Sequence, residues 1–477
     1  MAAPTLLAGL YLTAPALPGA ELLVQPEPLA PLPNPLEAMR QALEQPLGGA
    51  SLGDRVRPRD RVLVVVQPPA QLAPMGELNP LRLGLRAVLE LLRRRGLPQR
   101  NVRLLVANGL GHRPPMTELA RTLGVEVTGA YEVATFDAEA PRAFRSFGEP
   151  QLAMALGEAD LVIDLAVHAR AERPPLVNLV EGLGSYESLR ATHSPGLNAL
   201  DQAGKVIARA KTVAAALPLF SLAVVENGAV LAPRLRALLA GRGIASAART
   251  WNRLPQPVRR RVMARFRTSA APCAVFAGEP LAVAEQANAQ VRRDSAIAEG
   301  TRADVLVIGV PDLSPDAPTA RSNPVLAAHL GLTTLLARAR HRLSDAGAVV
   351  LVNPLEDRFD RALHLPYVEF YERALRVART GPELAARFEL DFSGRPELVA
   401  AYRKKGAVHG AHPFHRWYEL EAARRGLRIF AAGAGAAAAQ RVGIEPAEST
   451  EAAIAQAAEA LGLERPRVAV LDLLGLT

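Results

Sequence analysis

Histidines are the residues of this chain whose placement most clearly suggests chemistry. An imidazole titrates near neutrality, so it can move a proton or, when neutral, bind a metal ion. His112 follows the predicted strand 104–107, and His168 comes one residue after the predicted strand 159–167. In open parallel sheets, ligands bind beyond the carboxyl ends of the strands. Each histidine is therefore either a catalyst or a loop residue that only makes hydrogen bonds, and its position alone leaves both interpretations open.

Two segments in the second half also contain residues that could bind a ligand or a metal ion. His409, His412 and His415 recur every three residues, but Pro413 disfavours a regular helix there. This string indicates either a ligand or metal contact or a packed loop that joins two domains. Residues 429–438 follow a predicted strand and fit Gly-x-Gly-x-x-Ala loosely. That pattern indicates either a dinucleotide site or a plain turn from strand to helix.

The elements that would position these residues alternate along the chain. Apolar strands are predicted at 62–66, 104–107, 159–167, 303–310, 348–352, 427–432 and 467–474. Helices are predicted near 79–95, 150–157, 323–342, 367–379 and 450–461, and residues 195–268 are mostly helical in pattern. Apolar strands that alternate with helices predict parallel sheets covered on both faces. We expect an α/β fold of two domains, 1–268 and 269–477, each with a mostly parallel sheet covered by helices, and an active-site cleft between them.

Bulk composition limits the class of protein. A length of 477 residues with 49 % apolar residues favours two domains with large cores. The net charge of +9 comes mostly from scattered arginines, and the densest run, 258–267, has no aromatic interleaving, so we expect no nucleic-acid partner. Cys273 is the single cysteine, no Lys or Arg precedes Arg40, and no long uncharged helical segment occurs. These features predict a soluble, cytoplasmic protein that does not enter a membrane, of unknown oligomeric state.

Several motifs resemble the nickel-pincer lactate racemase family. Residues 106–117, which contain Gly111-His112-Arg113-Pro114 and Thr117, are similar to the family's Gly-x-His-Arg-Pro-x-Thr signature, with one extra residue. Residues 159–163 followed by His168 resemble its Ala-Asp-Leu-Ile-Ile…His element, and residues 192–194 fall where the family has Thr-Ile-x-x-Asn-His. Residues 38–56, 275–278 and 303–308 also occur in family order. The resemblance covers most of the chain and implies a racemase or epimerase of small 2-hydroxy acids.

The resemblance also implies site roles. His112 and His168 match the two acid/bases, His193 matches the nickel ligand, and Gly109 and Asn178 fall at cofactor-binding positions. Gln71 and Arg321 are the candidates for contact with the substrate. Asn178 stands where the family has the lysine that tethers the pincer nucleotide, and no lysine precedes Lys205, so a bound nickel-pincer nucleotide would be non-covalent. The alternatives are a family-derived protein that binds a ligand without racemase activity, and a dinucleotide-dependent oxidoreductase.

Overall fold

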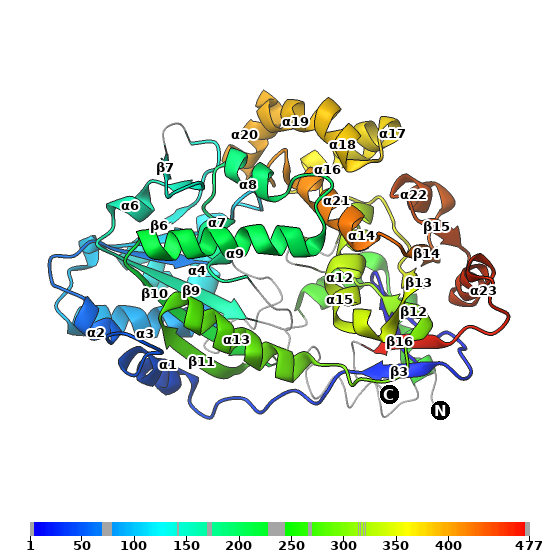
Figure 1. The fold of residues 1–477 in the computed structure, drawn as a ribbon, viewed down its shortest axis with the longest axis horizontal. Coiled ribbons are helices and arrows are strands. Elements are labelled where there is room, and N and C mark those ends of the chain that lie inside the picture. The colour runs from blue at the N-terminus through cyan, green and yellow to red at the C-terminus, as the bar shows by residue number, and fades with distance from the viewer. Residues whose placement is uncertain are drawn as a thin grey trace.

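The computed structural model describes residues 4–68, 79–140, 143–168, 174–227, 244–265, 270–312, 314, 316–317, 319 and 321–472. In this part of the chain the strands form two six-stranded sheets and two small two-stranded sheets. The two large sheets lie at opposite ends of the molecule, with helices around and between them (Figure 1). No helix within these ranges is long and apolar enough to cross a membrane.

The first large sheet has the order β11-β10-β9-β4-β5-β6. Its strands are β4 (Val62–Val66), β5 (Val102–Val106), β6 (Glu132–Thr135), β9 (Leu161–His168), β10 (Leu219–Glu226) and β11 (Pro272–Gly278). All neighbours pair in parallel except β10 and β11. Every residue of β4, β9 and β10 is buried, as expected for parallel strands covered on both faces.

Helices cover both faces of this sheet. They are α1 (Pro35–Glu44), α2 (Leu52–Arg55), α3 (Pro80–Arg94), α4 (Met116–Leu123), α5 (Val125–Ala130), α7 (Val177–Val180), α8 (Tyr186–Thr192), α9 (Ala199–Ala216) and α13 (Pro280–Ser295). The predicted helix 79–95 is confirmed: the side chain of Asn79 caps its first turn, and it ends before Gly96, whose φ is +77°. The predicted helix 150–157 is wrong, because Gln151–Ala153 is strand β8, paired with β7 (Phe144–Ser146), and only α6 (Ala155–Glu158) is helical.

The second large sheet has the order β15-β14-β13-β12-β16-β3 and is parallel throughout. Its strands are β3 (Glu21–Val24), β12 (Ala303–Gly309), β13 (Leu343–Val352), β14 (Arg428–Ala432), β15 (Glu445–Ala447) and β16 (Val468–Asp472). The four strands predicted in the second half are therefore confirmed. At the N-terminus, β1 (Leu6–Ala8) and β2 (Tyr11–Thr13) form a separate hairpin.

The helices of the second half occur in two groups. The first is continuous from α14 (Pro324–His329) through the π-helical Leu330–Leu335 to α15 (Leu336–Ala339), close to the predicted helix 323–342. The second group comprises α16 (Leu365–Glu369), α17 (Leu375–Val377), α18 (Gly381–Leu384), α19 (Leu390–Gly394), α20 (Pro396–Lys405), α21 (His412–Ala423), α22 (Ala436–Arg441) and α23 (Thr450–Leu461). The turn Gly433–Gly435 joins β14 to α22, a helix of 6 residues.

Two strands belong to the sheet that is formed mainly by the other half of the chain. β3, near the N-terminus, pairs with β16 in the second sheet, and β11, which begins after residue 268, pairs with β10 in the first sheet. The predicted division at residue 268 therefore does not coincide with the division between the sheets. Residues 195–268 also contain more than helices: besides α9, α11 (Ile244–Arg253) and α12 (Gln256–Arg265), they include β10, a fully buried strand that the helical prediction missed. Its Leu-Phe-Ser-Leu-Ala-Val-Val run is short and apolar, a pattern that strand and helix share.

Candidate functional site

The loop after β5 places Gly109 and His112 against distant segments. Gly109 has a φ of +51°, its N–H donates to the carbonyl oxygen of Gly182 at 2.9 Å, and a Cβ there would lie 2.6 Å from the carbonyl oxygen of Glu181. Only glycine accepts this conformation and this approach without strain. Gly109 thus fixes the loop to the turn after α7, and its predicted cofactor contact stays a prediction.

His112 lies at a contact between the two halves. Its Nδ1 bonds the carbonyl oxygen of Gly406, and its Nε2 lies 3.3 Å from Glu118 Oε2. Burial alone would lower the pKa of His112, but the bonds to Glu118 and Gly406 outweigh burial and raise the pKa above its ordinary value. An imidazole with a carboxylate partner on one nitrogen can hold and release a proton, so His112 retains the chemistry of an acid/base.

His168 and Asn178 line one small cavity. His168 is the last residue of β9 rather than the first residue beyond it, and it is 5 % exposed. Asn178, in α7, is 3 % exposed and donates from Nδ2 to Asp164 Oδ1 at 2.9 Å. The cavity between these residues, Ser221 and α13 measures about 20 Å³. That volume holds about one water molecule and no nucleotide.

His193 ends α8 inside a buried polar cluster. Its Nε2 lies 3.4 Å from Glu181 Oε1, its Nδ1 lies 3.1 Å from Glu419 Oε1, and its ring stacks on His415 with centroids 4.9 Å apart. Burial alone would lower the pKa of His193, but the bonds to Glu181 and Glu419 raise it to about 9. The two carboxylates therefore favour the protonated imidazole, whereas a metal ligand must be neutral, and the predicted role of His193 as a nickel ligand stays a prediction.

The same cluster continues along α21. Glu419 Oε2 bonds His329 Nε2 at 2.6 Å and accepts from Arg416 at 3.0 Å, and Arg416 Nε lies 3.0 Å from Asp316 Oδ2. We call the following residues the interdomain polar cluster, because they join α7 and α8 of the first half to the second half: Glu181, His193, Asp316, His329, Glu389, His412, His415, Arg416 and Glu419.

Two of the three histidines of the string in the second half, His412 and His415, are helical, contrary to the expected loop. Pro413 stands in the first turn of α21, where its missing N–H breaks no helical bond. His412 and His415 are buried, and burial lowers their pKa values to about 3 and about 4. His409 lies outside α21 and bonds Glu139 of the first half at 2.6 Å. The string therefore lies at a contact between the two halves, as one of the two interpretations proposed, but it does so through a helix and through the hydrogen bond of His409 to Glu139.

The structure brings four of the sequence-predicted site residues together in two pairs. Asn178 and His168 share a cavity, and Gly109 and His193 contact the same turn at residues 181–182. Arg321 is exposed, and Gln71 lies outside the described residues. Sequence reasoning missed Arg416 and Glu419, although the spacing of His412, His415, Arg416 and Glu419 matches one face of a helix.

These residues do not fit a tethered nickel-pincer nucleotide. Asn178 has no nucleophilic nitrogen and is held by Asp164, and the imidazole of His193 is clamped between two carboxylates. Within the described residues, no group of three or more His, Cys, Asp or Glu side chains is arranged to hold a metal ion.

Comparison with known proteins places the fold. Residues 17–164 match the lactate racemase N-terminal domain family. The lactate racemase apoprotein from Thermoanaerobacterium thermosaccharolyticum is similar over 100% of this chain and 99% of its own, with a TM-score of 0.64 and 14% identity. A protein from Thermotoga maritima is similar over 94% of this chain and 98% of its own, with a TM-score of 0.52 and 11% identity. A search of curated protein sequences found no match.

The family match contains the motif at His112, which follows β5, and ends four residues before His168 at the end of β9; β5 and β9 both flank β4 in the first sheet. These likenesses agree with the predicted architecture of two mostly parallel sheets covered by helices. The resemblance drawn from the sequence is thus confirmed: residues 17–164 match the lactate racemase N-terminal domain family, and the whole chain has a fold similar to that of the lactate racemase apoprotein.

Proposed function

We propose that this protein uses the lactate racemase fold to bind a small organic acid, without a covalently tethered pincer nucleotide and without the racemisation that such a cofactor performs. The likeness to a lactate racemase apoprotein supports the small organic acid, and one observation supports the absence of a tethered cofactor: the tether position is Asn178, buried and bonded to Asp164. A carboxamide is not a nucleophile, and no lysine precedes Lys205 in the chain. Because Asp164 accepts a hydrogen bond from the buried amide of Asn178, this side chain contributes to the local structure.

The protonation of His193 supports the same proposal. An imidazolium held between Glu181 and Glu419 contributes to the contact between the halves of the molecule. Deprotonating His193 so that it could bind a metal ion would weaken its ion pairs with Glu181 and Glu419. The protein's own contacts therefore favour His193 as a structural ion-pair partner over His193 as a metal ligand.

A second candidate is a racemase or epimerase of 2-hydroxy acids that binds a nickel-pincer nucleotide non-covalently. The raised pKa of His112 beside Glu118 favours it, because this side chain retains acid/base capacity at a family position. This candidate requires His112 and His168 to reach one substrate carbon from opposite sides.

One set of measurements separates the two candidates. Protein purified from its native host is weighed intact after denaturation, analysed for nickel, and incubated with each isomer of lactate and related 2-hydroxy acids. We expect the unmodified chain mass, no isomer exchange, and binding of a 2-hydroxy acid by calorimetry. Nucleotide-sized mass on the chain would overturn the proposal.

Isomer exchange by the wild-type protein would also overturn it if His112→Ala and His168→Ala both abolish the exchange. His341→Ala is the matched control, because His341 lies in the second half of the chain and bonds the carbonyl oxygen of Ile297 at 3.2 Å. Exchange that survives in all three variants would indicate a contaminating racemase.

A further inference from the structure

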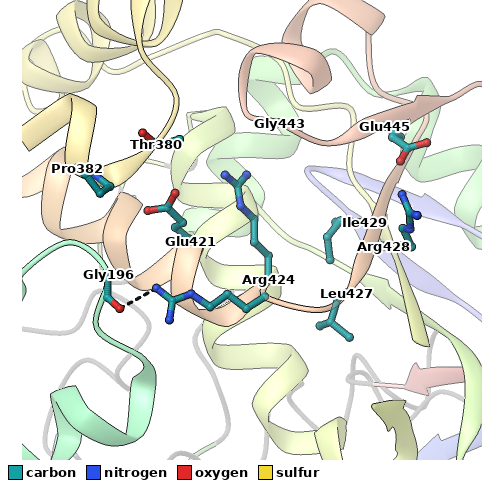
Figure 2. A pocket seen from close by; sticks show the side chains of 11 residues that line it. Gly196, Thr380, Pro382, Glu421, Arg424, Leu427, Arg428, Ile429, Gly443 and Glu445 are labelled. Atoms are coloured by element: carbon teal, nitrogen blue, oxygen red, sulfur yellow. Dashed lines mark hydrogen bonds between the residues drawn. The ribbon is translucent and has the colours of Figure 1, made fainter. Parts of the chain in front are cut away.

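One cavity among the described residues is lined by neither His112 nor His168. It measures about 610 Å³ and opens between the loop at Gly196, the start of α18, the end of α21 and strands β14 and β15. Figure 2 shows its lining side chains. A volume of this size is typical of small-molecule sites.

Three arginines line this cavity. They are Arg424, Arg425 and Arg428, and the lining also contains Glu421 and Glu445. The hydrogen bonds of Arg424 and Arg425 go to backbone carbonyl oxygens, of Val442 at 3.3 Å and of Gly196 at 2.7 Å. The guanidiniums thus keep donors for a ligand, because each has five N–H groups.

The neighbours of Arg424 favour an anion. Figure 2 shows its side chain extending between Glu421 and Ile429. Burial lowers the pKa of Arg424, and the nearby Glu421 only partly offsets this. One oxygen of Glu421 accepts from the Gly381 N–H at 2.9 Å. A bound oxyanion would replace lost hydration around the Arg424 charge, and guanidinium groups match oxyanions with paired hydrogen bonds.

The remaining walls are apolar. Leu427, Ile429 and Pro382 line the cavity, and Ile429 is 6% exposed. A ligand with one oxyanion and an apolar body would therefore satisfy the arginines and cover these side chains. Glu421 and Glu445 disfavour a ligand that carries several negative charges.

The geometry points to a binding site for a small organic ligand that has one oxyanion group, phosphate or carboxylate, and an apolar body. This site is independent of the proposed function, because none of its lining residues matches a family motif or contacts His112 or His168. Its occupant would touch both halves of the chain, because Gly196 belongs to the first half and lies three residues after His193.

The test uses three probes on the full chain: phenyl phosphate, benzoate and the neutral benzyl alcohol, each followed by isothermal titration calorimetry. We expect both anions to bind and benzyl alcohol not to bind, and the stronger of the two anions identifies the oxyanion class. Arg428→Gln and Arg424→Gln are each expected to weaken anion binding about tenfold or more. Arg376→Gln, on an exposed face of α17, is the matched control and should bind as the wild type does.

The two variants keep the test decisive. Arg424 packs over Trp417, with 5.4 Å from guanidinium carbon to ring centroid, so its replacement can also affect folding. Arg428 is exposed, and its replacement should leave the fold intact. No binding of either anion at millimolar concentration, equal binding of benzyl alcohol, or unchanged binding by Arg428→Gln would each overturn the inference.

Discussion

Replacing His193 by glutamine is expected to remove most of the loss of stability that the wild-type protein shows at alkaline pH. His193 is 8% exposed and lies between Glu181 and Glu419, which raise its pKa to about 9 against the burial that would lower it. An unfolded chain has no such partners, so the histidine there titrates near its ordinary value of 6.5. The folded state therefore binds a proton more tightly than the unfolded state does.

The magnitude follows from the two pKa values. A rise from 6.5 to about 9 corresponds to a stabilisation of about 3 kcal/mol. Because the folded pKa is raised, this contribution is complete below pH 6.5 and is lost as the pH rises through about 9. The neutral glutamine has no such proton to lose.

The assay is urea unfolding at pH 6.5 and pH 9.5, followed by the fluorescence of the buried Trp417. The free energy of unfolding of the wild type should fall by about 3 kcal/mol between these values, and that of His193→Gln by less than about 1 kcal/mol. His341→Gln, a histidine outside the interdomain polar cluster, should fall as the wild type does. An equal fall in wild type and His193→Gln would refute the assignment of the imidazolium.

Three further outcomes are expected. Burial lowers the pKa of His415 to about 4, so the folded state loses stability relative to the unfolded state as the pH falls from 6.5 to 4. In His415→Gln, the urea concentration at the midpoint of unfolding should therefore fall less over that range than in the wild type. Burial raises the pKa of Glu226 to about 7, so Glu226→Gln should stabilise the protein by about 3 kcal/mol at pH 8 and hardly at pH 4.5; equal effects at both values would contradict this. Gly109→Ala should destabilise by about 2 kcal/mol or more in urea unfolding, since its Cβ would meet the Glu181 carbonyl oxygen. Gly129→Ala, in a helix with nothing within 4 Å of the added Cβ, should be neutral or stabilising, and a similar loss in both alanine variants would argue against the close approach at Gly109.

The sequence by itself determined the class of fold and most of its elements. Val62–Val66 and Thr450–Leu461 lie within a residue of their predicted bounds, because an apolar run between turn residues, or a capped periodic segment, has one dominant local solution. The motif around His112, with the others, also indicated the likeness to lactate racemase that residues 17–164 bear out, since the spacing of residues in a motif is a local property of the chain. Asn178 in place of the tethering lysine was equally visible in the sequence.

The tertiary structure decided what the sequence leaves open. The pairing of β3 with β16 and of β11 with β10 depends on contacts between segments far apart in the chain, which no local pattern encodes. The protonation of His193 depends in the same way on Glu419, which lies in a different half of the molecule. A pKa is set by burial and by neighbouring charges, and both exist only after the chain has folded. Residue type therefore predicted that His193 has a role, and only the fold showed that its imidazole lies between two carboxylates that favour its protonated form.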